Sequence, residues 1–354
     1  MAGLANTLTQ SLRSSYPSNL DKYEDRLSRY GAWELAKRDT EDINSIVTQE
    51  VIDLAKRSIG NSVQIPVIDG ADVSIGSARS CTIADTENVS NLVTVSFTTY
   101  AFGFNMIPSM YFNNDIKYQA DYNRKLIKYL KKFASTLDTA VVSAVETAKS
   151  SKWDSAFVGA GAKYGALVGD AVQVANAEKN LIFNDLSTMM DEDDFEGVYN
   201  VLGSSTLKST VMQYTNQGAN NDTNTAFQFG DYDFTYSNRV TNGSGVEATF
   251  YAMPKGTIAT FNRNDPDSIA GSSVGEQVQW DTVEVPIVGL EMGVLYKKEC
   301  ADNSGVNGGS GAGHLTASLK ETFIWSTDVA IVTAYNSDTV NVPSPIHKGE
   351  ITVA

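Results

Sequence analysis

The spacing of hydrophobic residues changes several times along the chain and divides it into segments. Residues 1–60 are mostly polar and charged, with one apolar stripe at helical spacing between Ile43 and Ala55. A stripe this narrow buries too little apolar surface to form a core of its own. We therefore interpret residues 1–60 as an N-terminal arm that must lie on another surface.

From residue 61 the apolar positions alternate, which is typical of strands. Val63, Ile65 and Val67 alternate with other residues, and a second alternating run extends from Val89 to Phe104. The sequence between the two runs is polar. A lone hairpin is only marginally stable in water. We expect residues 61–107 to form an extended β-hairpin loop that is supported by another part of the chain or by a neighbouring chain.

Residues 115–150 carry the strongest helical pattern, with apolar residues every three or four positions and no internal Gly or Pro. The helix would be roughly 50 Å long. Its other face is basic and is interpreted first as a solvated surface, and second as a complement to an acidic partner or to nucleic acid. The cations are Lys117, Arg124, Lys125, Lys128, Lys131 and Lys132.

The second half of the chain mixes helical and strand patterns. A helix is predicted over 171–190, a strand over 198–202 and a short helix from Ser204. The rest is mostly β, and the tail containing Pro343 and Pro345 is predicted to be extended. The fold class is therefore α+β. Strands are predicted at 232–236, 247–253, 257–262, 277–285, 287–298, 315–325 and 329–335.

Composition narrows the range of functions. The chain has 354 residues and a formal net charge of −15, which disfavours general binding of nucleic acid except through a local basic patch. Cys81 and Cys300 are distant in sequence and are interpreted as ordinary small apolar residues of a protein in a reducing compartment. We expect neither a signal peptide nor a membrane-spanning segment.

Motifs for catalysis are largely missing. HExxH and GxxxxGK[ST] are absent, and His314 and His347 are both expected to be exposed. Gly271 to Gly275 match GxSxG around Ser273, but a nucleophile elbow needs a strand before it and a helix after it, so a loop is favoured. The acidic run 191–196 could bind a divalent cation, although a solvated helix end is preferred. We predict no catalytic residue, cofactor or metal site, and no enzyme activity.

The order of these elements resembles that of the major capsid proteins of tailed bacteriophages (Caudoviricetes), which share the Hong Kong 97-type fold with encapsulin nanocompartments. The resemblance covers about residues 30–340 and is carried by element order and by local sequence. The similar segments are Ser62–Val67 (first strand of the extended loop), Asn113–Lys149 (spine helix), Val198–Met212 (axial domain), Met253–Ala259 and Gln279–Val285 (strands returning to the peripheral domain) and Trp325–Ala334 (closing segment).

The resemblance implies a division of the chain into the domains of that fold. The implied parts are the arm 1–60, the extended loop 61–107, a peripheral domain of 108–165 and 256–327 that contains the spine helix 115–150, an axial domain of 166–255 and 328–342, and a C-terminal tail 343–354.

The resemblance also implies a function. Copies of the chain would form hexamers and pentamers of an icosahedral virion head that encloses double-stranded DNA, after assembly in the cytoplasm of the host bacterium. Expected partners are other copies, scaffolding, portal or decoration proteins, and packaged DNA through weak non-specific contacts. Some family members cross-link subunits through a lysine of the extended loop. Residues 58–116 contain no lysine, so a non-covalent shell is predicted.

Two alternatives are also compatible with the sequence. An encapsulin-like compartment would enclose a cargo enzyme in place of DNA, although the long arm disfavours it. A secreted hydrolase or adhesin would use the β-rich second half, and the hydrolase would depend on Ser273. This last class predicts a functional monomer, whereas both shell classes predict regular hollow particles.

Overall fold

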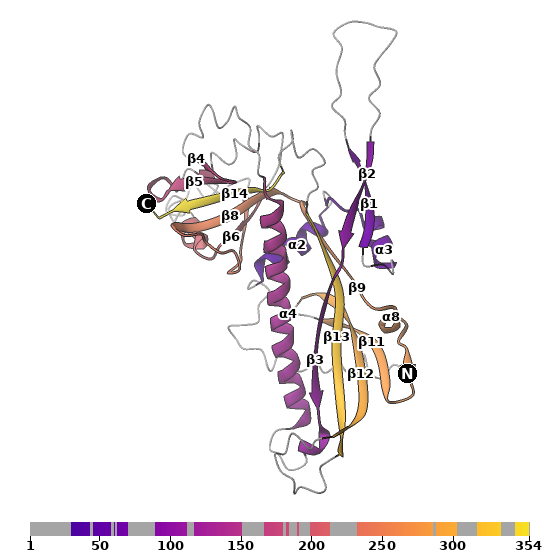
Figure 1. The fold of residues 1–354 in the computed structure, drawn as a ribbon. Helices are drawn as coiled ribbons and strands as arrows, with labels where there is room; N and C mark the ends of the chain where they lie inside the picture. The colour runs from indigo at the N-terminus through magenta and orange to yellow at the C-terminus, as the bar shows by residue number, and fades with distance from the viewer. Residues whose placement is uncertain are drawn as a thin grey trace, which may run out of the picture.

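The computed structural model describes residues 30–42, 45–57, 60, 62–69, 89–111, 117–150, 166–179, 182–183, 190, 199–212, 232–285, 288–302, 317–333 and 344–353. These residues form two six-stranded sheets, a two-stranded hairpin and one long helix. The first six-stranded sheet runs along the length of the molecule and the second lies at its upper left (Figure 1).

The first sheet has the strand order β10-β11-β12-β13-β3, and β9 also pairs with β13. Its strands are β10 (Ser273–Val274), β11 (Val278–Val285), β12 (Leu290–Asp302), β13 (Ala317–Thr333), β3 (Thr98–Met106) and β9 (Ile258–Arg263).

Two boundaries predicted from sequence are wrong in this sheet. The two strands expected at 315–325 and 329–335 are one strand, β13, so residues 328–333 continue the first sheet and do not enter the second one. β3, which was assigned to the extended loop 61–107, pairs with β13 along its whole length. The reason is aromatic packing, because Phe102 stacks on Trp325 with ring centroids 6.1 Å apart and Phe104 stacks on Phe323 at 5.6 Å.

The long helix expected over 115–150 is α4 (Tyr118–Ala148), which runs beside β3 and β13 (Figure 1). Its 31 residues span about 46 Å. The apolar stripe of α4 is buried, with Leu126, Leu130 and Leu137 fully inaccessible, and it forms the main core together with the first sheet. A short 3-10 helix, η2 (Pro108–Tyr111), leads from β3 towards α4.

The second sheet has the order β4-β5-β14-β8-β6-β7 and contains its own core. Its strands are β4 (Ala166–Val168), β5 (Ala171–Ala175), β14 (His347–Thr352), β8 (Val246–Pro254), β6 (Tyr199–Gly203) and β7 (Tyr232–Tyr236). The helix predicted over 171–190 is therefore wrong at its start. Val172 and Val174 alternate with Gln173, and this period of two places them on the buried face of a strand.

Residues 347–352 of the predicted extended tail are indeed extended, but they form β14 inside the second sheet, parallel to β5 and antiparallel to β8, and are no separate tail. His347 is fully buried there instead of exposed, and this burial lowers the pKa of its imidazole to about 4. Gly349 permits the close packing, since a Cβ at this position would lie 2.2 Å from the Phe250 ring. Smaller elements are η3 (Asn176–Glu178), α3 (Gln49–Arg57) and α8 (Pro266–Ala270).

Helix α2 (Gly31–Thr40) corrects the interpretation of residues 1–60 as an arm without a core. Ala32, Trp33, Leu35 and Ala36 are fully buried in the main core of the same chain. Trp33 also donates a hydrogen bond from Nε1 to the Val288 carbonyl at 3.1 Å. The helix was missed because charged residues interrupt its short apolar pattern, and its neighbours come from distant parts of the chain.

Polar contacts tie α2 to both sheets and to α4. Arg38 forms an ion pair with Asp233 of β7 at 3.1 Å, and Asn200 of β6 donates to the buried Asp39 carboxylate at 2.6 Å. The Trp33 backbone N–H donates to Asp138 of α4 at 3.0 Å. Helix α2 thus fastens the two sheets together.

Burial raises the pKa of Asp39 to about 6, although hydrogen bonds from the Gly256 and Ile258 backbones oppose the shift. A raised folded-state pKa means that the folded protein binds the proton more tightly than the unfolded chain, so the Asp39 contribution to stability is lost as the pH rises through 6. Between about pH 5 and pH 7 that loss amounts to about 1 kcal/mol.

We therefore expect the stability difference between wild type and Asp39→Asn to be about 1 kcal/mol more in favour of wild type at pH 5 than at pH 7. Asparagine cannot titrate, and the other groups titrate alike in both proteins and cancel. Urea unfolding of unassembled subunits at the two pH values measures the difference. The same difference at both pH values would show that the Asp39 pKa is not raised.

Candidate assembly site at the root of the hairpin

The extended hairpin forms a sheet separate from the two six-stranded sheets. β1 (Ser62–Asp69) and β2 (Val89–Ser96) pair antiparallel from Ser62 opposite Ser96 to Asp69 opposite Val89. Among the described residues these two strands form a sheet of their own. The hairpin projects beyond the end of the first sheet (Figure 1). A projecting hairpin can reach a second molecule, so its orientation depends on how its root is held.

A small hydrophobic cluster holds the root. Val63 of β1, Val95 of β2 and the adjacent Phe97 are buried against α3 and the end of the first sheet. Helix α3 contributes its narrow apolar stripe to this cluster. The sheet contributes Ala259, Phe261 and Ala330. Residues 45–57 thus rest on their own chain through Val47, Ile52 and Ala55.

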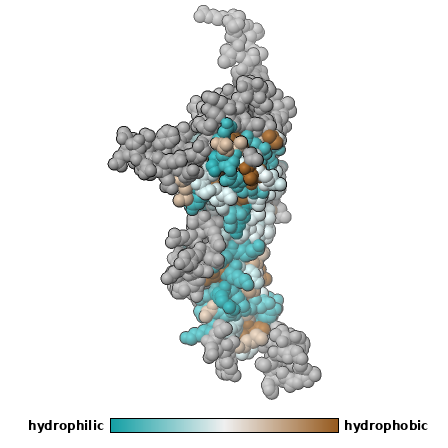
Figure 2. Space-filling model, turned by 90° about the vertical axis from the view of Figure 1, so that its left-hand side faces the viewer, coloured by the Kyte–Doolittle hydropathy of each residue, from teal (hydrophilic) through white to brown (hydrophobic). Residues whose placement is uncertain are grey.

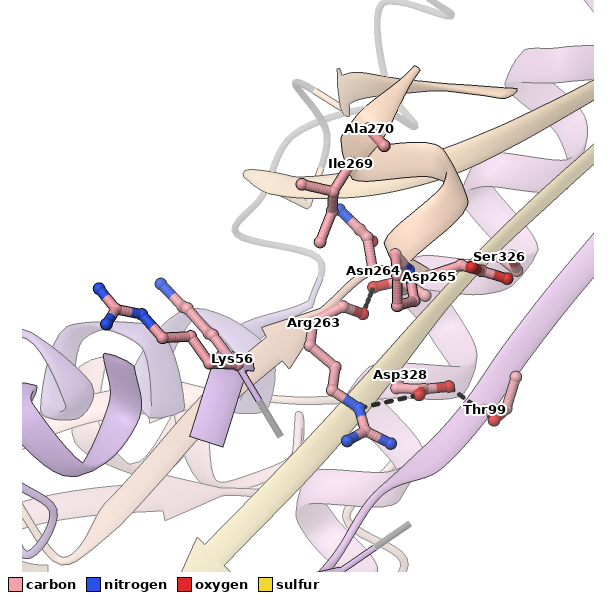
Figure 3. Close-up of a pocket in the computed structure, with 12 residues that line it drawn as sticks. Lys56, Thr99, Arg263, Asn264, Asp265, Ile269, Ala270, Ser326 and Asp328 are labelled. Carbon is pink, nitrogen blue, oxygen red and sulfur yellow. Dashed lines mark hydrogen bonds and ion pairs between the residues drawn. The ribbon is translucent and has the colours of Figure 1, made fainter. Parts of the chain in front are cut away.

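Arg263, the last residue of β9, is the polar centre of the root. Its Nε lies 3.1 Å from Oδ2 of Asp328, and the hydroxyl of Thr99 donates to Oδ1 of the same carboxylate at 2.6 Å (Figure 3). The guanidinium carbon lies 4.1 Å from the centroid of the Phe97 ring, and Nη1 donates to the Gly60 carbonyl. Arg263 is only 7% exposed. One side chain therefore connects β9, β13, β3 and both ends of the hairpin region.

Beside Arg263 lies a pocket of about 680 Å³ between α3, α8 and β13 (Figure 3). Lys56 and Arg57 line it from α3, and Asp265 and Ile269 line it from the α8 side. Ile269 is 63% exposed. Mixed charges around one exposed apolar side chain are typical of a contact surface for protein, and the lining contains no histidine or cysteine that could act as a base or nucleophile.

Replacing Arg263 with Met should loosen the hairpin selectively. Loss of the charge-assisted bonds to Asp328 and Gly60 should reduce the stability of the root by about 2 kcal/mol, which corresponds to about 30-fold faster hydrogen exchange. Exchange mass spectrometry should show this in β1 and β2, while β8 of the second sheet keeps its protection. Arg57→Met removes the same charge from the exposed rim of the pocket and should leave exchange unchanged. Equal effects of the two variants would remove Arg263 from this role.

Sequence reasoning missed the root because its residues are far apart along the chain. Arg263 and Asp328 are each one charged residue at the edge of an apolar run, and nothing local links them to Phe97. The only sequence signal was an arginine next to the predicted strand 257–262. The sequence predicts no catalytic or metal role for any of these residues.

The structure places Ser273 of the GxSxG match on the exposed short strand β10. Helix α8 precedes it and strand β11 follows it, which is the reverse of a nucleophile elbow. Cys300 is exposed and free. Cys81, His314 and the acidic run 191–196 lie outside the described residues. Within the part of the chain that the structure describes, no three His, Cys, Asp or Glu side chains are grouped to hold a metal ion.

Comparison with known proteins gives no match at the level of sequence families. No family model matches the chain, and no curated protein matches it. Two solved structures align over nearly the whole length at a TM-score of 0.50. The capsid of Ralstonia phage GP4 is 12% identical, and the alignment covers 96% of this chain and 96% of that one. The capsid asymmetric unit of cyanophage Pam1 is 11% identical, with 96% and 97% covered.

The chain has the fold of phage capsid proteins. At this level of identity the likeness concerns the fold alone. The capsid fold agrees with the mixed α/β architecture and with the resemblance seen in the sequence. No helix within the described residues of this chain is both long and apolar enough to cross a membrane.

Proposed function

We propose that this protein is a phage major capsid protein of the Hong Kong 97 type, which assembles into hexamers and pentamers of an icosahedral head around double-stranded DNA. The observation that supports it most directly is the full-length structural likeness to two phage capsid chains. In this proposal the protein acts by assembly, not by catalysis, and its final location is the virion.

The two sheets supply the proposed domains. The first sheet with α4 is the peripheral domain, and the second sheet is the axial domain, which now includes β14. Helix α2 joins the two sheets within one subunit, so it belongs to the core. In this proposal the arm is limited to the residues that precede α2. This division differs from the one expected from sequence at residues 31–57, 98–107, 328–333 and 343–354.

The hairpin is the proposed link between subunits. Its strands pair only with each other in the described residues, so their outer edges keep backbone groups for a neighbour. The segment 58–116 offers no lysine amine for a cross-link. The contacts are therefore non-covalent, and many modest interfaces in a closed shell combine to give high stability.

An encapsulin-like compartment is the alternative. Its subunits would form the same type of shell but would enclose a cargo enzyme in place of DNA. Electron microscopy of the purified full-length protein tests both, since each requires regular hollow particles, whereas a monomeric hydrolase or adhesin gives none. Nuclease-protected DNA inside particles from phage-infected cells supports the capsid, and a protein cargo supports the compartment. A protein that remains monomeric at all concentrations contradicts the proposed function.

A further inference from the structure

The basic face of α4 lines a groove of about 800 Å³ between this helix and β3, an edge strand of the first sheet. Four cations line the groove, together with Tyr129 of α4 and Gly103, Phe104 and Asn105 of β3. The cations are Arg124, Lys125, Lys128 and Lys132. The face on which α4 lies is largely hydrophilic down its length (Figure 2). The groove is therefore a local positive site on a chain with a net charge of −15.

Little negative charge balances this groove. Residues 122–137 of α4 contain no Asp or Glu. Asp121 lies at the end of the groove, with its side chain only 9% exposed, and it forms ion pairs with Arg124 at 3.1 Å and Lys125 at 3.0 Å. Among the described residues, Lys128 and Lys132 have no acidic partner within ion-pair distance. These two exposed cations repel each other weakly, and an anion bound between them would relieve that repulsion.

The spacing of the cations matches a linear polyanion. Arg124, Lys128 and Lys132 follow one another at four-residue intervals, so they lie on one stripe of the helix with about 6 Å of rise between neighbours. Successive phosphates along a nucleic acid strand have a similar separation. Arg124 has a side chain that is 77% exposed and can turn towards such a strand.

The lining favours phosphates over a protein partner. Protein interfaces depend on buried apolar anchors, and the only exposed apolar side chain in the groove is Tyr129. The Tyr129 ring is already stacked on Phe102 at 5.6 Å and on Phe104 at 5.9 Å. The remaining exposed lining consists of four cations, Gly103 and the polar Asn105, groups that bind phosphate without reading bases.

We propose that the groove between α4 and β3 binds the phosphate backbone of nucleic acid, without sequence preference, through Arg124, Lys128 and Lys132. The inference rests on the proposed function in one respect, because an enclosed genome is the source of the nucleic acid. It assigns the contact to one face of the subunit, which would then line the interior of the shell. The acidic remainder of the surface would keep the contact weak and dependent on salt.

The test measures binding of a short fluorescently labelled DNA duplex to unassembled full-length subunits by anisotropy over a series of salt concentrations. We expect the variant Arg124→Gln/Lys128→Gln/Lys132→Gln to bind at least about tenfold more weakly at low salt. The slope of log affinity against log salt should also fall by about 3 in magnitude, since three phosphate contacts are lost. Lys208→Gln/Lys255→Gln/Lys297→Gln removes the same charge from solvent-accessible sites outside both pockets and should bind as wild type.

Two results would overturn the inference. Equal weakening by both triple variants would mean that binding follows net charge and not the groove. Stronger binding of polyglutamate than of the duplex, lost in the groove variant alone, would assign the groove to an acidic protein segment. Particle formation by the groove variant, followed by electron microscopy, should be normal, so failure of this inference is distinguishable from failure of the proposed function.

Discussion

Replacing residues 70–88 with an Asn-Gly turn is expected to abolish shell formation and to leave a soluble, folded subunit. The replacement suits the structure because Asp69 and Val89 are directly opposite each other at the last described pair of the hairpin. A two-residue Asn-Gly turn closes such a pair with the twist that the strands require. The root cluster of Val63, Val95 and Phe97 is untouched. The subunit therefore loses its reach and keeps its fold.

The loss of assembly should be complete because each subunit in a closed shell repeats the same contact, so one missing interface is missing everywhere. Sedimentation velocity and electron microscopy of the trimmed protein should show unassembled subunits at concentrations where wild type forms particles. A matched control replaces 70–88 with a Gly/Ser linker of equal length. This control should also fail to assemble if the side chains of the tip make the contact. Intact particles from the trimmed protein would remove the hairpin from the mechanism.

Trp33→Ala should lower the free energy of unfolding by about 4 kcal/mol, the largest effect that we expect from a single substitution. Trp33 is fully buried in the main core, and it also donates to the Val288 carbonyl, which would lose its partner. Since α2 joins both sheets, we expect less cooperative unfolding as well as lower stability. Denaturant unfolding below the assembly concentration, followed by circular dichroism, measures both.

The matched control is Leu54→Ala in the neighbouring helix α3. Leu54 is 64% exposed, so its truncation should change stability by no more than about 0.5 kcal/mol. Trp33→Phe keeps most of the apolar volume and loses only the indole donor, and its effect should be between the two. A Trp33→Ala protein as stable as the Leu54→Ala protein would restore the interpretation of residues 31–40 as a peripheral arm.

The two predictions separate what a subunit does alone from what it does with neighbours. The trimmed hairpin affects assembly without changing the fold, and Trp33 affects the fold first. In the proposed capsid, the region before β1 therefore has two roles. Helices α2 and α3 complete the subunit and hold the hairpin root, and the hairpin reaches the neighbour. A variant screen for assembly should distinguish these roles by measuring the stability of every non-assembling variant.

The sequence by itself determined the elements whose periodicity is strong and local. The long helix α4, the alternating hairpin strands and most strands after residue 230 follow from spacing alone, because each buries one face against whatever lies beside it. The local sequence around Ser273 also predicted that this residue lacks the preceding strand and following helix of a nucleophile elbow, and the structure has α8 before it and β11 after it. The order of these elements was enough to indicate the capsid fold.

Only the tertiary structure decided which elements pair and which charged residues act together. Helix α2 has a weak local pattern and is fixed by neighbours more than a hundred residues away in sequence, such as Asp138 and Val288. The strand β14 was hidden by the prolines before it and becomes a strand only between β5 and β8. The Arg263 root unites residues from four separate segments. Such contacts depend on long-range packing energy, which local periodicity does not contain.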